Sequence, residues 1–267
     1  MSGILTLDIG NSNIVTVLYD RAGNRLADDR QETIKEENYR KYKEFFQSIN
    51  TSLPVHRPDA VILSCVVPYV RETVYKVMAE VYPDSVLYRV APGMVPDMTV
   101  CLEEPRELGA DIAATTVGAY HKYKELTIIA DLGSATKLGV VDEAFNMRGG
   151  IIMPGIAFQA RSLHQMIPHL PDIELKRPAK VIGDNTIHSI QSGIINGSLG
   201  AIIELGRAIE KELGQKCHKL ITGGLAKLFQ PEDLQDFEYD EFLLSDGLYH
   251  IANYWLNSPT QPEIYHP

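Results

Sequence analysis

Cysteine is scarce in this chain. The three present, Cys65, Cys101 and Cys217, are widely spaced and form no C-x-x-C pair. Such spacing provides neither a disulfide framework nor a zinc motif, so we expect buried, reduced thiols of a cytoplasmic protein. The eight histidines include no H-x-x-x-H or H-E-x-x-H pattern, and we expect no zinc site at them either.

Long apolar runs and dense basic runs are missing as well. No stretch approaches the length of a membrane helix, and Asp8 interrupts the first apolar run, which does not fit a signal peptide. The formal net charge of −10, with no Lys/Arg cluster to offset it, argues against nucleic acid as a partner. We therefore predict a cytoplasmic protein without membrane or nucleic-acid contacts, in which local donors and metal hold any anionic substrate.

The sequence also lacks the G-x-x-x-x-G-K-[ST] motif and a dinucleotide-binding fingerprint, which disfavours a P-loop nucleotide site. Its 267 residues, 45% of them hydrophobic, suffice for one large or two modest domains with their own cores. Any nucleotide site in such a protein must use a different turn.

An acidic glycine turn between two apolar strands is present, and it occurs twice. Residues 4–18 contain it as Asp8-Ile9-Gly10-Asn11-Ser12-Asn13, and residues 126–141 contain it as Asp131-Leu132-Gly133-Ser134-Ala135-Thr136. Each pattern predicts a β-hairpin. One copy alone would be an ordinary hairpin turn without a binding role. Two copies about half the chain apart predict two domains of similar plan with a ligand cleft between them.

The chemistry of this turn suits phosphate. Glycine permits positive φ and close approach to the backbone, and the following Asn, Ser and Thr residues add donors beside the backbone N–H groups. An aspartate at the strand end would repel a bare phosphate, so we expect a cation, Mg²⁺, between the two. Such turns can hold the phosphates of a nucleotide.

The remaining pattern indicates a mixed α/β protein. Residues 60–67 form a continuous apolar run closed by Pro68, as in a buried parallel strand. We expect further strands near Arg25 and at 86–90, 147–152 and 219–222, and helices at 36–50, 71–81, 107–123, 155–166 and 186–213. The repeat divides the chain into predicted domains at 1–115 and 116–267.

Two more segments have residue types that suit a site. Thr222-Gly223-Gly224 follows an apolar strand, where two glycines would let an adenine or ribose lie against the backbone; a purely structural turn is the commoner explanation. Asp111 lies near a predicted helix start, where a carboxylate usually stabilises the helix end. It is alternatively a general base that takes the proton of an alcohol during phosphoryl transfer.

Taken in order, these motifs resemble those of type III pantothenate kinases over nearly the whole chain. The likeness also includes Gly109-Ala110-Asp111, Ser64-Cys65-Val66-Val67-Pro68, Gly149-Gly150-Ile151-Ile152-Met153-Pro154-Gly155, Ile182-Gly183-Asp184-Asn185-Thr186 and Gln191-Ser192-Gly193. The resemblance implies two similar actin-like (ribonuclease H-like) domains with an ATP cleft between them, the fold of sugar kinases and Hsp70-type ATPases. It also implies a cytoplasmic homodimer that phosphorylates pantothenate to 4'-phosphopantothenate, the first step of coenzyme A biosynthesis.

The resemblance further implies site residues, position by position. Asp111 would accept the proton of the pantothenate hydroxyl, Asp8 would hold Mg²⁺ through the ATP phosphates, and Asp131 would bind an activating monovalent cation, K⁺ or NH₄⁺. The implied ATP contacts are Asp8, Ile9, Gly10, Asn11, Ser12, Asn13, Ile14, Val15, Ser134, Gly223 and Gly224. The implied pantothenate contacts are Leu102, Gly109, Ala110, Asp111, Ile112 and Thr186.

Four positions depart from the family pattern. Ile112 stands where the family has Arg, Leu102 where it has a substrate-pocket Tyr, Ser134 where it has Thr and Lys137 where it has another Thr; the change at Ser134 keeps the hydroxyl. The first two changes leave open a kinase for a less polar alcohol, or a catalytically impaired homologue that acts as a nucleotide- or ligand-binding regulator or partner subunit. Lys137 shares strand parity with Asp131, so its ammonium either replaces the monovalent cation or is a solvated lysine.

Overall fold

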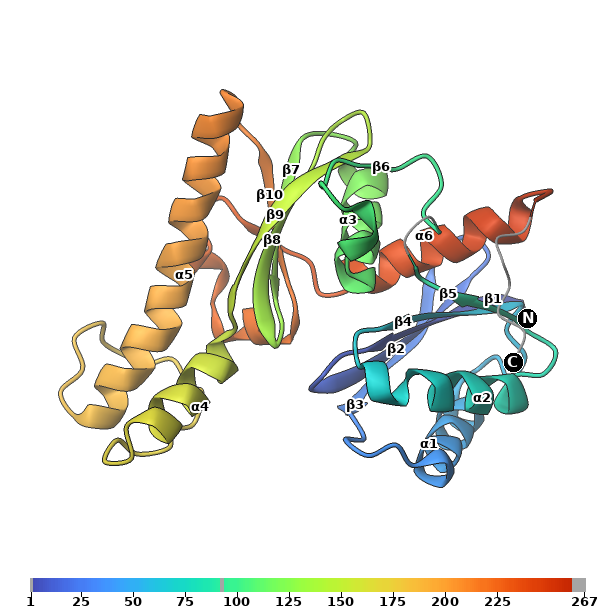
Figure 1. Ribbon diagram of the computed structural model, residues 1–267, viewed down its shortest axis with the longest axis horizontal. Coiled ribbons are helices and arrows are strands. Elements are labelled where there is room, and N and C mark those ends of the chain that lie inside the picture. Colours follow the sequence, from blue (N-terminus) through green and yellow to red (C-terminus); the bar gives the residue numbers. More distant parts are fainter. Residues whose placement is uncertain (1, 92–93, 261–267) are drawn as a thin grey trace. The chain divides into compact units, whose positions relative to one another are not determined.

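The computed structural model describes residues 2–91 and 94–260, which form two compact units (Figure 1). The first unit contains the described residues up to Lys122 and those from Phe242 onward, and the second is Tyr123–Glu241. The predicted boundary after residue 115 follows the sequence repeat, whereas the compact units separate after Lys122 and the helix near the C-terminus belongs to the first unit. Each unit has its own sheet and its own apolar core.

The sheet of the first unit has the strand order β3-β2-β1-β4-β5. Its strands are β1 (Gly3–Ile9), β2 (Asn13–Asp20), β3 (Arg25–Glu32), β4 (Ala60–Cys65) and β5 (Val86–Arg89). The first three form an antiparallel meander, and β1, β4 and β5 are parallel to one another. The predicted first hairpin and buried parallel strand are therefore confirmed, and every residue of β4 is buried because the sheet is covered on both faces.

Helices cover the two faces of this sheet (Figure 1). On one face, α1 (Tyr39–Ser52) and α2 (Arg71–Val81) pack against each other and fill the core with Tyr42, Phe46 and Tyr75, each at most 1% exposed. The Asn38 side chain accepts a hydrogen bond from Lys41 N and starts α1 a few residues later than predicted. On the other face, α6 (Leu243–Asn257) contacts β1 and β4.

Two glycines allow α6 to lie directly against α3 (Ala110–Tyr123). A Cβ added at Gly247 would lie 1.8 Å from the Ala114 carbonyl oxygen, and one at Gly118 would lie 2.2 Å from the Leu243 carbonyl oxygen. The two helix backbones are therefore in contact. The sequence interpretation missed α6 altogether. It also did not predict three short elements of this unit, which are β6 (Thr99–Val100) and the 3₁₀ turns η1 (Pro68–Val70) and η2 (Pro105–Glu107).

The second unit repeats the plan of the first, as the sequence predicts. The strands β7 (Thr127–Leu132), β8 (Ala135–Val141) and β9 (Asn146–Pro154) form an antiparallel meander. Parallel to β7 runs β10 (His218–Thr222), and beyond it the short β11 (Glu238–Tyr239), which was not expected. The second hairpin is thus confirmed, with the acidic glycine turn between β7 and β8.

The helices of the second unit are α4 (Ile156–Met166) and the long α5 (Thr186–Leu213), with 3₁₀ turns η3 (Gly224–Leu228) and η4 (Pro231–Asp233). Asn185 caps α5 by accepting a hydrogen bond from His188 N at 2.9 Å. Gly214 ends the helix with a φ of +70°, a conformation that glycine adopts without a steric cost. Both ends of α5 are therefore set by local sequence, which is why its predicted bounds agree with the structure.

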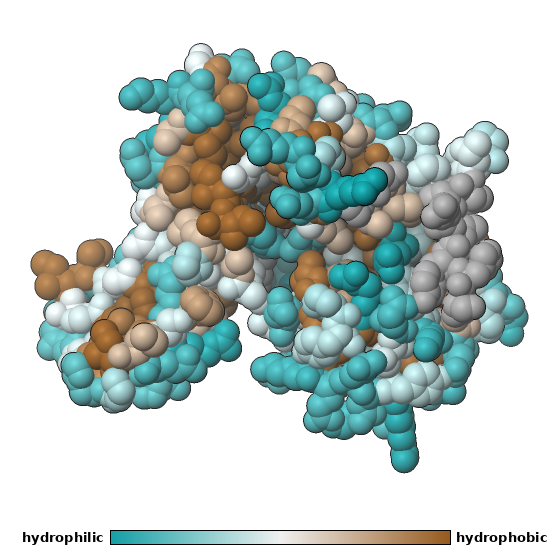
Figure 2. All heavy atoms as spheres, in the orientation of Figure 1, coloured by the Kyte–Doolittle hydropathy of each residue, from teal (hydrophilic) through white to brown (hydrophobic). Residues whose placement is uncertain are grey.

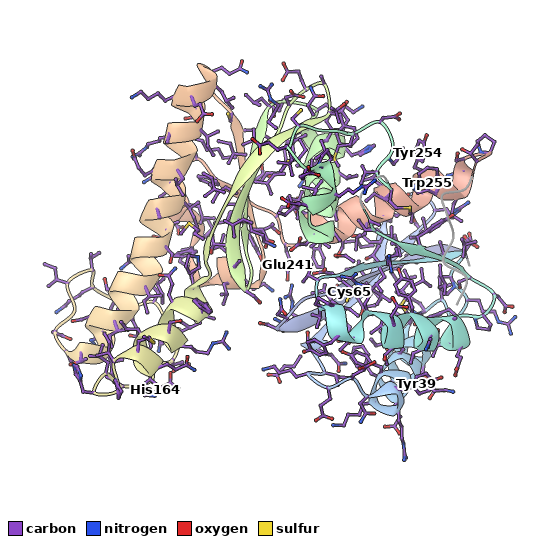
Figure 3. All side chains as sticks on the ribbon, viewed as in Figure 1. Tyr39, Cys65, His164, Glu241, Tyr254 and Trp255 are labelled. Atoms are coloured by element: carbon purple, nitrogen blue, oxygen red, sulfur yellow. The ribbon has the colours of Figure 1, made fainter. Side chains whose placement is uncertain are left out.

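The cysteines partly correct the expectation from sequence. All three are free thiols, and Cys65 at the end of β4 is buried beside α2, as Figure 3 shows. Cys101 is exposed, so the prediction that each thiol is buried is wrong there, and Cys217 is half-buried.

Glu210, near the end of α5, forms ion pairs with two lysines, and we expect these ion pairs to stabilise the second unit. Its carboxylate, 7% exposed, lies 3.1 Å from the Lys219 ammonium and 3.0 Å from that of Lys216. Burial by itself would raise the pKa of Glu210, but a hydrogen bond from Cys217 N and the two lysines outweigh it and hold the pKa at about 2. The native state therefore strongly favours the carboxylate.

We expect Glu210→Gln to lower the free energy of unfolding at neutral pH by about 3 kcal/mol, because the depressed pKa links ionisation to folding. Since the folded pKa is below the unfolded one, this contribution is complete above the ordinary value of 4.5 and is lost as pH falls toward 2. Urea unfolding of both proteins across this range measures it. Glu212→Gln, on the exposed face of the same helix, is the control and should change stability little; equal effects of the two variants would contradict the prediction.

Candidate nucleotide and acceptor site

The turn between β1 and β2 presents backbone and polar side chains outward while its apolar neighbours point inward. Ile9 and Ile14 are at most 1% exposed, so only their backbone atoms can meet a ligand. Asn11 and Ser12 at the tip are exposed, and Gly10, Asn13 and Val15 are half-buried. Gly10 N donates to the Asn13 carbonyl at 2.9 Å, which closes the turn. The tip can therefore offer donors to phosphate oxygens.

Thr33 stabilises this turn with two hydrogen bonds. The sequence interpretation did not single this residue out. Its hydroxyl donates to the Gly10 carbonyl at 2.6 Å, and its backbone N–H donates to the Ser12 carbonyl at 3.0 Å. The residue follows β3 in the chain, and only the pairing of β2 with β3 brings it to the turn. No local pattern marks it.

Asp8 lies on the face of the sheet that α6 covers. Leu5, Leu7 and Ile9 of β1 belong to the core shared with α1 and α2. Because side chains alternate along a strand, Asp8 projects to the opposite face. It pairs in register with Ser64 of β4, another strand that α6 contacts.

Asp111 lies in the first turn of α3, the helix that packs on α6. Its Oδ1 accepts a hydrogen bond from Ile112 N at 2.9 Å, and a Cβ added at Gly109 would lie 2.7 Å from the same oxygen. Gly109 therefore leaves room for the carboxylate to fold over the helix start. The side chain is half-buried, as are those of Leu102, Ala110 and Ile112. Position and accessibility suit either of the two predicted roles, the helix-end carboxylate and the general base.

In the second unit, Asp131 forms an ion pair with Lys137. The two residues face each other across the β7–β8 hairpin, and the Lys137 ammonium lies 2.8 Å from Asp131 Oδ2. The sequence interpretation placed Asp131 and Lys137 on the same face of one extended strand. That geometry is wrong, because the turn places the two residues on neighbouring strands. Their side chains are 15% and 16% exposed, so Lys137 is not a solvated lysine.

The glycine turn after β10 lies against the same aspartate. Gly223 has a φ of +93°, and a Cβ added there would lie 2.6 Å from Asp131 Oδ1 and 2.7 Å from the Leu132 backbone. Both the positive φ and these short distances exclude a side chain at this position. The structure therefore brings two turns together. One is the β7–β8 turn, which has exposed Ser134 at its tip, and the other is the turn formed by Gly223 and exposed Gly224.

Thr186 lines a different feature, an open cavity of about 740 Å³. The cavity lies between α4, the segment before α5 and the first turns of α5, and its lining includes Leu163, Leu170, Gly183, Asn185, Thr186 and Ile194. Asp184 at its rim accepts a hydrogen bond from His188 when Nδ1 carries the proton, which lowers the pKa of Asp184. Thr186 is exposed, so its hydroxyl is available to a ligand.

The implied metal ions fit these residues unequally. A single carboxylate at the end of β1, beside a turn that can bind phosphate, suits a Mg²⁺ held mainly by phosphate oxygens and water. At Asp131 the Lys137 ammonium already neutralises the carboxylate, so the residues do not fit an additional monovalent cation. Within residues 2–91 and 94–260, no group of three or more His, Cys, Asp or Glu side chains could hold a metal alone. Over the same described residues, no helix has the length and apolarity to cross a membrane.

Solved structures show which class of protein this architecture defines. ROK hexokinase from Thermus thermophilus matches with a TM-score of 0.52 at 14% identity over 94% of this chain and 97% of that one. The activator of 2-hydroxyisocaproyl-CoA dehydratase from Clostridium difficile, solved with bound ADPNP, matches with a TM-score of 0.52 at 12% identity over 94% and 93%. The fold is therefore that of the actin-like ATPases and ROK sugar kinases, as predicted.

Sequence relatives narrow this class to one family. The family model for type III pantothenate kinase matches residues 4–208. A type III pantothenate kinase from Pelobacter propionicus is 35% identical over 251 residues, 92% of this chain and 96% of its own, and one from Geobacter sulfurreducens is 34% identical over 250 residues with the same coverage. The chain belongs to the type III pantothenate kinase family.

Proposed function

We propose that this protein transfers the γ-phosphoryl group of ATP to the hydroxyl of pantothenate, giving ADP and 4'-phosphopantothenate for coenzyme A biosynthesis in the cytoplasm. The observation that carries the proposal is Asp111, which lies half-buried at the start of α3 in a chain that matches the family over most of its length. The pantothenate oxygen attacks the γ-phosphorus, the bond to the ADP oxygen breaks, and Asp111 takes the hydroxyl proton.

The turns supply the nucleotide contacts in this proposal. The turn from Asp8 to Val15, with exposed Asn11 and Ser12 at its tip, binds the phosphates, and Asp8 holds Mg²⁺ through them. Magnesium neutralises charge that develops on the transferred phosphoryl group. Ser134, Gly223 and Gly224 contact ATP from the second unit, where the missing side chains let a flat group approach the backbone.

The acceptor contacts are Leu102, Gly109, Ala110, Ile112 and Thr186. Ile112 Cδ1 would lie 3.9 Å from a Cβ at Gly109, so its side chain is beside the Gly109–Asp111 segment where the acceptor hydroxyl must come. An apolar group at this place favours a second candidate function, phosphorylation of a less polar alcohol.

A homodimer is part of the proposal, and one face of the second unit suits it. Large apolar side chains are exposed around α4 and the start of α5: Phe158, Met166, Val181, Ile182 and Ile187, of which Met166 and Ile182 are 81% and 86% exposed. Figure 2 shows brown patches over these elements. Exposed apolar groups gathered in one place are typical of protein interfaces, and a second copy of this chain would also narrow the open cavity at Thr186.

The proposal is tested by measuring ADP release from ATP and Mg²⁺ with and without pantothenate. We expect turnover that depends on pantothenate; bound ATP with no turnover would contradict the proposal. The double variant Ile112→Arg with Leu102→Tyr then separates the remaining possibilities. A gain in pantothenate turnover would show an intact catalytic apparatus with a changed acceptor pocket, whereas an inactive protein without gain would favour the regulator.

A further inference from the structure

We infer that Lys137 is a built-in cation for the second acidic glycine turn, so that this protein binds nucleotide without K⁺ or NH₄⁺ at Asp131. The inference rests on the proposed function for the identity of the nucleotide. Its structural basis is independent, because all the contacts involved lie within the second unit.

The hairpin fixes the position of the ammonium. Asp131 and Lys137 are directly opposite in the β7–β8 register, with Nζ 2.8 Å from Oδ2. Both residues lie within strands, so the pair is held by the backbone ladder on each side, and neither side chain is more than 16% exposed. A surface lysine with a flexible stem is not held in this way.

The pair lies where two ligand-binding turns meet. Asp131 is the penultimate residue of β7, two residues before the turn to β8 begins at Gly133, and its other carboxylate oxygen lies against Gly223. The positive φ of Gly223 and the absence of a side chain there bring the Gly223 turn up to this carboxylate. A single positive charge fixed at Asp131 therefore serves both turns.

The charge of Lys137 also excludes a second cation. A protonated amine carries the same single charge as K⁺ or NH₄⁺ and donates hydrogen bonds as NH₄⁺ does. An ion at the Asp131 carboxylate would lie next to the Lys137 ammonium, which has the same sign of charge. The position is mostly buried, and repulsion between like charges is strong in a buried position. The lysine thus replaces the ion rather than accompanying it.

Melting of the ligand-free protein in KCl, NH₄Cl and choline chloride at equal ionic strength tests the inference without any catalysis. We expect the wild type to melt at the same temperature in all three salts. Lys137→Thr, which restores the residue of the family pattern, should melt lower in choline and recover in K⁺ or NH₄⁺, because an ion then binds at Asp131. Lys211→Thr, at an exposed position of α5, is the matched control and should show no salt preference.

Binding of a non-hydrolysable ATP analogue is the second readout. In choline chloride we expect Lys137→Thr to bind the analogue at least about tenfold more weakly than the wild type, since a charge-assisted contact is lost, with recovery in KCl. A wild type whose melting temperature or analogue affinity rises strongly with K⁺ would overturn the inference, and so would a Lys137→Thr variant indistinguishable from wild type in every salt. If that variant does not fold, the wild-type result alone decides. Failure of the pantothenate assay leaves the salt response of the ligand-free protein unaffected, so the two proposals fail separately.

Discussion

Asp111→Asn is expected to lower pantothenate-dependent turnover by about 10²–10⁴-fold, the usual contribution of a general base. An amide cannot take the hydroxyl proton, yet its carbonyl oxygen can still accept the hydrogen bond from Ile112 N that orients the Asp111 side chain. The folded structure and ATP affinity should therefore stay unchanged. Steady-state ADP release, with ATP binding measured by calorimetry, checks both parts.

Asp172→Asn provides a matched control for that substitution. Asp172 also accepts a hydrogen bond from the next residue, with 3.0 Å between its Oδ1 and Ile173 N, but it lies exposed in a loop of the second unit. The same chemical change there should leave turnover as it is. If Asp111→Asn kept turnover within a few-fold of the wild type, Asp111 would be a helix-end carboxylate and the base would lie elsewhere.

Gly247→Val is expected to destabilise the first unit by about 2–4 kcal/mol, because overpacking at a tight helix crossing forces backbones apart. Any Cβ at this position would overlap the Ala114 carbonyl oxygen at 1.8 Å, and backbone atoms cannot move aside as the end of a flexible side chain can. Since α3 carries Asp111 and α6 packs on the strands of Asp8 and Ser64, turnover should fall together with stability. Thermal and urea unfolding measure the change.

Gly200→Ala tests whether the crossing, rather than the loss of a helical glycine, causes the effect. Gly200 lies exposed within α5, and a Cβ there would meet nothing within 4 Å. Replacing it should raise stability by about 0.5–1 kcal/mol through helix propensity. A Gly247→Val protein as stable as the wild type would show that the two helices can separate without cost.

The far end of α6 shows a further contact that holds this helix. The indole N–H of Trp255 donates to the Met94 carbonyl at 2.8 Å, and Figure 3 shows Trp255 beside Tyr254 near the end of the helix. Together with the glycine crossing, this fixes α6 along its length. The helix is thereby part of the support for β1, the strand that carries Asp8.

Local sequence determined most of the secondary structure and the family. The two hairpins follow from alternating apolar residues around an acidic glycine turn, and the bounds of α5 follow from Asn185 and Gly214, since caps act through neighbouring atoms. The order of the motifs was sufficient to indicate type III pantothenate kinase and the actin-like fold. The assigned roles of the site residues remain predictions.

Tertiary structure alone decided where distant residues meet. Strand pairing brings Thr33 to the Gly10 turn and sets Lys137 opposite Asp131, and helix packing returns α6 to the first unit through Gly118 and Gly247. The contacts of Thr33 and of the two glycines have no local signal, because their partners are far away along the chain; Asp131 and Lys137 are close in sequence, but their pairing depends on the register of the hairpin. Lys137 makes the difference plain: its sequence position allowed either a solvated lysine or a cation, and the hairpin register, by burying it on Asp131, makes it a fixed charge.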